Sequence, residues 1–192
     1  MNLNTSKSAL KPWQLTEETL HAKCRIFNVY RQSYKHLERA QKGDFFVIKS
    51  PNWVQVLALT PKQDLILVRQ FRFGSATLSI ETPAGLIETN ETPIEAAQRE
   101  LLEETGYIGD SAHIIGTCRP NPALQDNLAY FVFIENCQPK GAHAWDLHEE
   151  LETIQAPLNE VFAAVKKGDI DHALTLTALF YLSSSLNLSG MS

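Results

Sequence analysis

Cysteine and methionine are scarce in this chain of 192 residues, which has three of the first and two of the second. The cysteines Cys24, Cys118 and Cys137 are an odd number, and no two of them have the Cys-x-x-Cys spacing. That pattern excludes a disulfide framework and a cysteine zinc site. We therefore expect reduced thiols and a cytoplasmic protein.

Long hydrophobic runs are also missing. The longest weakly charged stretch, residues 173–188, is too short and too rich in serine and threonine to span a bilayer. Residues 1–11 are polar and lack the apolar region of a signal peptide. The net charge of −5 argues against a binder of nucleic acid or of anionic membranes. We expect neither a membrane nor a nucleic acid as a partner.

What is present is typical of a globular protein, with 44% hydrophobic and 20% charged residues. The length suits one domain with a small extension. Alternating and apolar stretches of the sequence predict strands. We expect a loop over 73–79 and helices over 93–105, 158–167 and 171–186. The expected strands are residues 21–30, 44–49, 52–60, 65–71, 112–119 and 128–136. Strands with one central helix and helices at the end predict an α+β fold.

The central helix has the clearest local signals. Thr92 and Glu95 have the spacing of a capping box, in which each side chain bonds the backbone N–H of the other. Pro93 stands at the first helical position, where its missing N–H costs nothing. Gly106 suits the left-handed residue that ends a helix. We therefore expect this helix to begin at Pro93 and to end at Thr105.

Three carboxylates gather on one face of this helix. Glu100, Glu103 and Glu104 are i, i+3 and i+4 neighbours, so they repel one another, and the nearby cation Arg99 lies on the flank. A divalent cation would relieve that repulsion, and hard oxygen ligands favour Mg²⁺, with Mn²⁺ as a substitute. The alternative is an ordinary solvated acidic face.

The spacing of this segment resembles the box of the Nudix hydrolase family. The matching residues are Gly85, Glu91, Arg99, Glu100, Leu101, Glu103, Glu104 and Gly106. Tyr107 departs from the pattern, which has an aliphatic residue there. The resemblance implies a Nudix fold, a mixed β-sheet sandwiched between helices. It also implies an N-terminal β extension over residues 1–50, acting as a dimerisation element, before a hydrolase domain over 51–192.

The resemblance implies a metal site at the box. Glu100 and Glu104, one turn apart, are the first candidates for ligands of Mg²⁺ or Mn²⁺, with Glu103 as a third. In the family the box glycine, here Gly85, permits a bend that brings a carbonyl to the metal, and here that is the carbonyl of Ala84. The alternative for Gly85 is a plain turn glycine.

Catalytic roles follow from the same resemblance. Arg99 would orient a box glutamate, with Glu91 as its expected partner, or else form a surface ion pair of little energetic value. The general base would be a glutamate of the loop before the last strand, Glu149 first and Glu150 second. Alternatively, Glu103 takes that role from within the box, and the loop is merely acidic.

Further motifs resemble the ADP-ribose and sugar-nucleotide pyrophosphatase branch of the family. Gln70-Phe71-Arg72 precedes Glu81-Thr82-Pro83-Ala84-Gly85, and a proline, Pro122, follows the box. Arg72 would grip a diphosphate, since a guanidinium forks onto phosphate oxygens, or else face solvent. Glu81 would bond a ribose or support its loop, and Pro122 could be an ordinary turn proline. Trp53 is a candidate for stacking a nucleobase, although most aromatics in strands belong to the core.

The expected function is therefore Mg²⁺-dependent hydrolysis of the diphosphate in a nucleoside diphosphate sugar, with ADP-ribose giving AMP and ribose 5-phosphate. Other Nudix substrates are GDP-mannose, ADP-glucose, NADH, coenzyme A and dinucleoside polyphosphates. A non-catalytic ligand sensor on the same fold is a further alternative, although such domains commonly lose box carboxylates and this chain keeps them. The resemblance also implies a homodimer.

Overall fold

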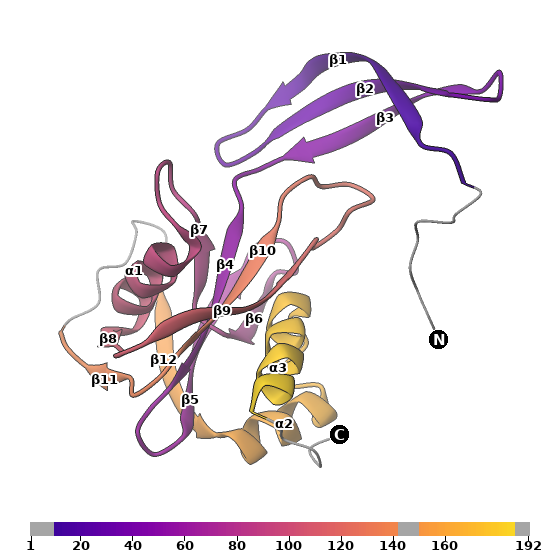
Figure 1. Cartoon of the computed structure of the whole chain (residues 1–192). Helices are drawn as coiled ribbons and strands as arrows, with labels where there is room; N and C mark the ends of the chain where they lie inside the picture. The colour runs from indigo at the N-terminus through magenta and orange to yellow at the C-terminus, as the bar shows by residue number, and fades with distance from the viewer. Residues whose placement is uncertain (1–9, 142–149, 187–192) are drawn as a thin grey trace. The chain divides into compact units, whose positions relative to one another are not determined.

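The structure is a computed structural model that describes residues 10–141 and 150–186. The chain divides into two compact units (Figure 1). The N-terminal unit takes the chain up to Pro51 together with Asn121–Asn127. The C-terminal unit takes Asn52–Pro120 and the chain from Leu128 onward.

The N-terminal unit is a three-stranded antiparallel sheet in the order β1 (Trp13–Lys23), β2 (Asn28–His36), β3 (Lys42–Lys49). Residues 121–127 lie along β3, where the N–H of Ile48 donates to the carbonyl of Leu124 at 2.8 Å. Among the described residues of this unit, no hydrophobic side chain is buried. The sheet therefore has no hydrophobic core of its own.

The expected strand over residues 21–30 is wrong. β1 ends at Lys23, the N–H of Cys24 donates to the carbonyl of Phe27 at 3.0 Å, and β2 begins at Asn28. The segment is thus a hairpin turn between two strands. Its sequence contains neither glycine nor proline, and the commonest β-turn tolerates most residues, so the alternating pattern passes through the turn without a signal.

The C-terminal unit is built on a mixed sheet. Its path runs β12 (Leu151–Pro157), β5 (Asp64–Arg72), β4 (Trp53–Leu59), β10 (Ala129–Ile134), β9 (Ala112–Cys118), with β6 (Thr77–Glu81) on β5 and β7 (Ala84–Leu86) on β4. The pair β4–β10 is parallel and the other pairs are antiparallel. A short ladder joins β8 (Tyr107–Ile108) to β11 (Gln138–Pro139). The helices are α1 (Pro93–Thr105), α2 (Leu158–Lys167) and α3 (Ala173–Ser185).

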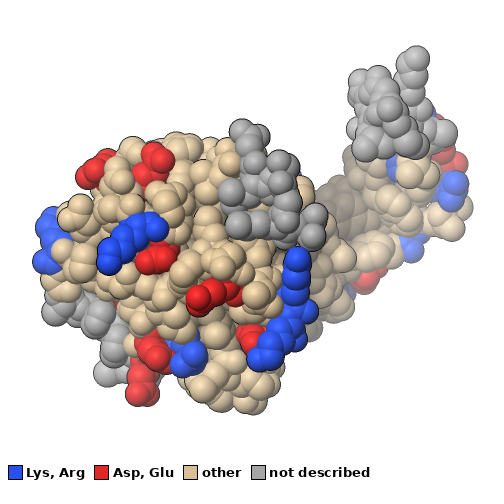
Figure 2. Space-filling view, turned by 90° about the horizontal axis from the view of Figure 1, so that it is seen from below, with Lys and Arg blue, Asp and Glu red and all other residues tan. Residues whose placement is uncertain are grey.

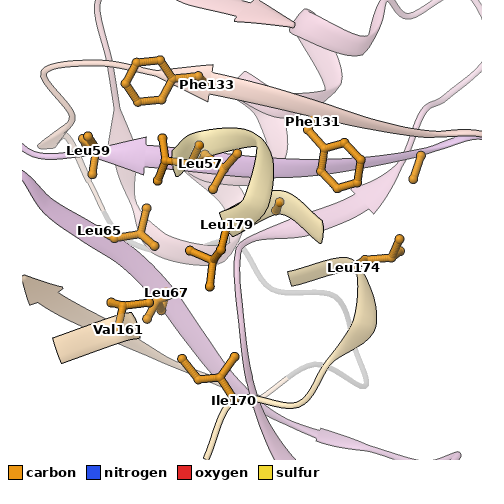
Figure 3. Packing of buried hydrophobic residues seen from close by; sticks show 13 residues of the cluster. Leu57, Leu59, Leu65, Leu67, Phe131, Phe133, Val161, Ile170, Leu174 and Leu179 are labelled. Carbon is orange, nitrogen blue, oxygen red and sulfur yellow. The ribbon is translucent and has the colours of Figure 1, made fainter. Parts of the chain in front are cut away.

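Helices cover both faces of this sheet (Figure 1). Successive side chains of a strand point to opposite faces, so Val56 and Ala58 pack with α1, whereas Leu57 packs on the other face with α2 and α3. That second cluster includes Leu179 of α3 (Figure 3). Because both faces are covered, β4 is apolar apart from Gln55 rather than alternating. Burying one such leucine contributes about 2 kcal/mol.

The helix α1 has the bounds expected from its sequence. Thr92 accepts a hydrogen bond from the backbone N–H of Glu95 at 3.2 Å, and Glu95 accepts one from the N–H of Thr92 at 2.8 Å. Gly106 ends the helix in the left-handed conformation, with φ of 73°. The capping box and the glycine cap are both confirmed, and they set where the acidic face begins and ends.

The fold class is confirmed as α+β, with a mixed sheet between helices. The expected loop over 73–79 is partly wrong, because β6 begins at Thr77 and pairs with β5. The short strand β7 was also not expected. Its pairing with β4 places the segment that leads into the box directly on the sheet.

Within the described ranges, no helix combines the length and the apolar character needed to cross a membrane. On the face shown in Figure 2, acidic and basic side chains lie next to one another. Ion pairs also form within the described residues, such as Arg69 with Glu152 at 2.5 Å. Opposite charges are therefore interspersed on that face.

Candidate active site

The glycine that opens the box lies where no side chain would fit. Gly85 is in β7, opposite Val54 of β4, and a Cβ added to it would lie 1.9 Å from Oε1 of Glu100. Its backbone is not left-handed, so its function here is to leave space for a carboxylate. The alternative of a plain turn glycine does not hold.

The neighbouring turn of α1 brings a second carboxylate to β7. Glu104 has only 4% of its surface exposed, and its Oε2 accepts a hydrogen bond from the N–H of Ala84 at 3.1 Å. Ala84 thus donates to this helix through its N–H. That its carbonyl binds a metal stays a prediction. Glu100 and Glu104 approach adjacent residues of one strand from successive helical turns.

Arg99 connects the helix to the loop before it. Its Nε and Nη2 donate to the two carboxylate oxygens of Glu91 at 2.8 and 2.9 Å, and Nη2 also donates to the carbonyl of Leu86 at 2.9 Å. Its Nη1 donates to Glu100 and to Glu103, at 2.8 and 3.0 Å. The expected pairing of Arg99 with Glu91 is confirmed. Charge-assisted bonds of this kind hold both groups in one geometry.

This pairing sets the charge states around the box. The hydrogen bond from Arg99 holds the pKa of Glu91 below its usual value, and the same bond raises the pKa of Arg99. Glu91 is therefore ionised at neutral pH, and Arg99 stays charged. The side chain of Arg99 is partly buried, with 26% exposed, so solvent screens this pair less than a surface pair.

Among the described residues, no three histidine, cysteine or acidic side chains are grouped closely enough to hold a metal ion. Glu100 and Glu103 instead share the guanidinium of Arg99, which relieves their mutual repulsion. The donors nevertheless suit a hard divalent cation. The carboxylates of Glu100 and Glu104 are largely buried, and that of Glu100 occupies the space that Gly85 leaves beside β7.

Arg72 and Glu81 form an ion pair on the hairpin of β5 and β6, in which the carboxylate is buried and the arginine side chain is partly exposed. Nε and Nη2 of Arg72 donate to the two oxygens of Glu81 at 2.8 and 2.6 Å. The side chain of Glu81 has no exposed surface, whereas that of Arg72 is 42% exposed. This burial favours the supporting role for Glu81 over contact with a ribose. Arg72 reaches the surface, as a phosphate-binding residue must.

The remaining expected residues lie elsewhere. Glu149 falls outside the described residues, and Glu150 is exposed directly before β12. Trp53 is partly buried and packs against the core cluster of α2 and α3, where a core aromatic would lie. Pro122 is exposed and belongs to the N-terminal unit.

Sequence reasoning missed His172, which lies before the first turn of α3. Its Nδ1 is 3.2 Å from Oε2 of Glu81. The six histidines of the sequence show no metal-ligand spacing. No local pattern marks this one, because its partner is 91 residues away along the chain and only the folded sheet brings them together.

A carboxylate-bearing helix, fastened by an arginine to its own loop and packed on a mixed sheet, defines a class of diphosphate-cleaving hydrolases. The Nudix domain matches residues 50–179, more than half of the chain. The chain therefore belongs to the Nudix family and is a Nudix hydrolase.

Similar proteins have related activities in their names. The chain is 31% identical over 137 residues to an ADP-ribose pyrophosphatase of Bacillus subtilis strain 168, covering 71% of this chain and 74% of the relative. It is 26% identical over 187 residues to the ADP compounds hydrolase NudE of Escherichia coli strain K12, covering 96% and 98%. A crystal structure of an ADP compounds hydrolase covers 97% of this chain and all of the other, with a TM-score of 0.83 and 23% identity. That likeness shows the fold.

Proposed function

We propose that the protein hydrolyses the diphosphate of nucleoside diphosphate sugars, with ADP-ribose as substrate and AMP and ribose 5-phosphate as products. The observation that carries the proposal is the close approach of Glu100 to Gly85, which only glycine permits. It brings a box carboxylate onto the sheet beside Ala84. The names of the relatives, an ADP-ribose pyrophosphatase and an ADP compounds hydrolase, support the substrate class.

Glu100 and Glu104, with Glu103 and the carbonyl of Ala84, would hold Mg²⁺, or Mn²⁺ in its place. When bound, the cation supplies charge neutralisation for the phosphates and makes water more acidic. Arg99 fixes the orientation of Glu100, because their hydrogen bond of 2.8 Å is one of several that fasten the guanidinium. These hydrogen bonds already hold the side chains in one arrangement. Substrate binding therefore does not have to organise them.

The remaining roles belong to the substrate and to water. Arg72 binds a phosphate oxygen, and Glu149 or Glu150 accepts a proton from the attacking water, with Glu103 as the alternative base. One oxygen–phosphorus bond forms to water, and the bond from that phosphorus to the bridging oxygen breaks. The electron pair stays on the leaving phosphate. Trp53 is the proposed stacking partner of the nucleobase, and Pro122 stays a separate candidate for binding substrate.

We also propose a homodimer, in which the N-terminal extension of residues 1–50 joins two hydrolase domains of residues 51–192. The supporting observation is that this sheet exposes Trp13, Leu15 and Phe45 by 40 to 48% of their surface. A three-stranded sheet without a buried apolar face is marginal on its own. Light scattering should give twice the monomer mass. A monomer at micromolar concentration would rule the dimer out.

A cytoplasmic location is proposed from the thiols. Cys24, Cys118 and Cys137 are free, as expected for a reducing compartment. Fractionation of cells that express the chain, with thiol labelling of the purified protein, tests this proposal. A disulfide-linked species in the native protein would contradict it.

A substrate panel tests the function. The protein is incubated with ADP-ribose, ADP-glucose, GDP-mannose, NADH, coenzyme A and a dinucleoside polyphosphate, in Mg²⁺, in Mn²⁺ and in a chelator. The phosphomonoesters formed are measured after phosphatase treatment. We expect ADP-ribose to be turned over fastest and the chelator to stop turnover.

A matched pair of variants then tests the site. Glu100→Gln should lower turnover by roughly 10²-fold or more, since a metal ligand contributes several kcal/mol to the transition state. Glu160→Gln, an exposed glutamate at the start of α2, should leave turnover unchanged. Full activity of Glu100→Gln would reject the site, and tight binding of ADP-ribose in Mg²⁺ without hydrolysis would favour the ligand sensor.

A further inference from the structure

A chain of buried polar contacts extends from the Arg72–Glu81 pair to the start of α3. Nδ1 of His172 lies 3.2 Å from Oε2 of Glu81 and 3.0 Å from Oγ1 of Thr175. Thr175 has no exposed surface, and its hydroxyl oxygen accepts a hydrogen bond from the N–H of Thr82 at 3.3 Å. The residue that follows Glu81 is thus also fastened to α3.

The charges of Glu81 and His172 follow from their surroundings in this network. Burial opposes ionisation of Glu81, but the bonds from Arg72 outweigh it and hold the pKa of Glu81 below its usual value. Nδ1 of His172 lies 3.2 Å from the ionised carboxylate and shares a hydrogen bond of 3.0 Å with the hydroxyl of Thr175. Burial lowers the pKa of His172, so the ring is neutral at pH 7. The charge of Glu81 is therefore balanced by Arg72.

We propose that His172 and Thr175 are positioning residues for Arg72. His172 contacts the Glu81 carboxylate, and Thr175 fastens His172 and the N–H of Thr82. That carboxylate, bound to Nε and Nη2, holds the guanidinium of Arg72 in one orientation. The inference rests on the proposed function, in which Arg72 binds a phosphate of the substrate. It adds to that function His172 and Thr175, which orient Arg72 for its contact with the phosphate.

The physical advantage is preorganisation. A free arginine side chain carries about 2 kcal/mol of rotamer entropy, which binding must otherwise remove. Here the inner edge of the guanidinium bonds a carboxylate with no exposed surface, while 42% of the Arg72 side chain faces solvent. The side chain is thus ordered from its buried end, and part of it reaches the surface.

The competing interpretation is that His172 merely attaches α3 to the sheet. The two interpretations differ in how His172 and Arg72 combine. If His172 acts through Arg72, its effect on substrate binding disappears once Arg72 is gone, because there is no guanidinium left to orient. If it only stabilises the fold, the two effects add.

The experiment is a double-mutant cycle of His172→Ala and Arg72→Ala, with KM and kcat measured for ADP-ribose in Mg²⁺. We expect His172→Ala to raise KM about fivefold to tenfold with kcat changed less than about twofold, as for lost binding through one hydrogen bond. In the Arg72→Ala protein the same substitution should leave KM unchanged. His172→Asn keeps a donor in the place of Nδ1 and should restore most of the affinity. Equal effects in both backgrounds would overturn the proposal.

A control variant and a second test variant separate a positioning role from a general effect on folding. His113→Asn, at an exposed histidine of β9, should change neither constant. Thr175→Val keeps the shape of the side chain and removes its hydroxyl, so it repeats the test if His172→Ala does not fold. It should raise KM in the native protein and leave KM unchanged in the Arg72→Ala protein.

A second readout does not depend on turnover. The Nε–H of Arg72 should exchange slowly with water in nitrogen-15 NMR spectra of the native protein, and at least about fivefold faster in His172→Ala or Thr175→Val if these residues hold Glu81. Unchanged exchange in both variants would overturn the positioning role. If no substrate of the panel is hydrolysed, the proposed function fails, and this measurement still decides whether His172 and Thr175 order Arg72.

Discussion

Replacement of Gly85 by alanine gives the sharpest test of the box geometry. The new Cβ would lie 1.9 Å from Oε1 and 2.1 Å from Cδ of Glu100, whereas ordinary contact begins at 3.4 Å. The carboxylate must therefore retreat by about 1.5 Å. It is the flexible end of a side chain, so the backbone of β7 need not move, and we expect the free energy of unfolding to fall by less than about 1 kcal/mol.

The effect on catalysis should be far larger than the effect on stability. A misplacement of about 1 Å at a positioned group can lower the rate by roughly 10²-fold, so we expect kcat/KM for ADP-ribose to fall on that order. The assay is phosphomonoester release in saturating Mg²⁺, with thermal unfolding measured on the same samples. The retreat would also strain the 2.8 Å bond from Arg99 to Glu100.

Gly74→Ala is the matched control. A Cβ at Gly74 would meet no heavy atom within 4 Å, and Gly74 does not adopt a left-handed conformation. This variant should keep both stability and activity. If Gly85→Ala keeps full activity with ADP-ribose, the position of Glu100 beside β7 has no catalytic importance, and the reasoning that carries the proposed function fails.

Other predictions concern charge and thiols. Arg99→Lys keeps the charge but loses the fork onto Glu91, so kcat/KM should fall about tenfold to 100-fold, measured with ADP-ribose. Glu81 has a folded-state pKa below its unfolded value, so its contribution to stability is complete above about pH 4.5 and is lost as the pH falls through the folded pKa. Glu81→Gln should therefore be about 1–3 kcal/mol less stable at pH 7, and its denaturant-unfolding profile should be flatter below pH 4.5. Burial raises the pKa of Cys137 to about 12, so at pH 8 iodoacetamide should label exposed Cys24 and leave Cys137 unmodified in the native protein, as mass spectrometry can show.

Each of these predictions has an outcome that contradicts it. Wild-type activity in Arg99→Lys would mean that the fork onto Glu91 does not orient the box. A Glu81→Gln protein with the native pH profile would mean that this carboxylate is not ionised by its partners. Rapid labelling of Cys137 under native conditions would mean that its thiol reaches solvent.

The box helix was predictable because its signals are local. The capping box of Thr92 and Glu95 and the cap at Gly106 involve contacts within a few residues, so the sequence contains both partners of each bond. The pairing of Arg99 with Glu91 also lies within one loop and helix. The largely apolar run of β4 likewise predicted a strand, since burial on both faces favours apolar residues at successive positions.

The turn at Cys24 to Phe27 and the strand β6 were not predictable in the same way. The turn has no glycine or proline, and β6 becomes a strand by pairing with β5. Whether a short segment pairs depends on the edge available to it, and that edge is formed by residues distant in sequence.

By itself, the sequence determined the class of the protein, because the spacing within the box places Arg99, Glu100, Glu103 and Glu104 on one helix whatever surrounds it. Tertiary structure alone decided which space each of these groups occupies. Glu100 sits against Gly85 because β7 pairs with β4, and Glu81 meets His172 because α3 packs on the sheet. The geometry of a helix depends on residues that are neighbours in sequence. Contacts between side chains distant in sequence depend on how the strands pair and how the helices pack on the sheet.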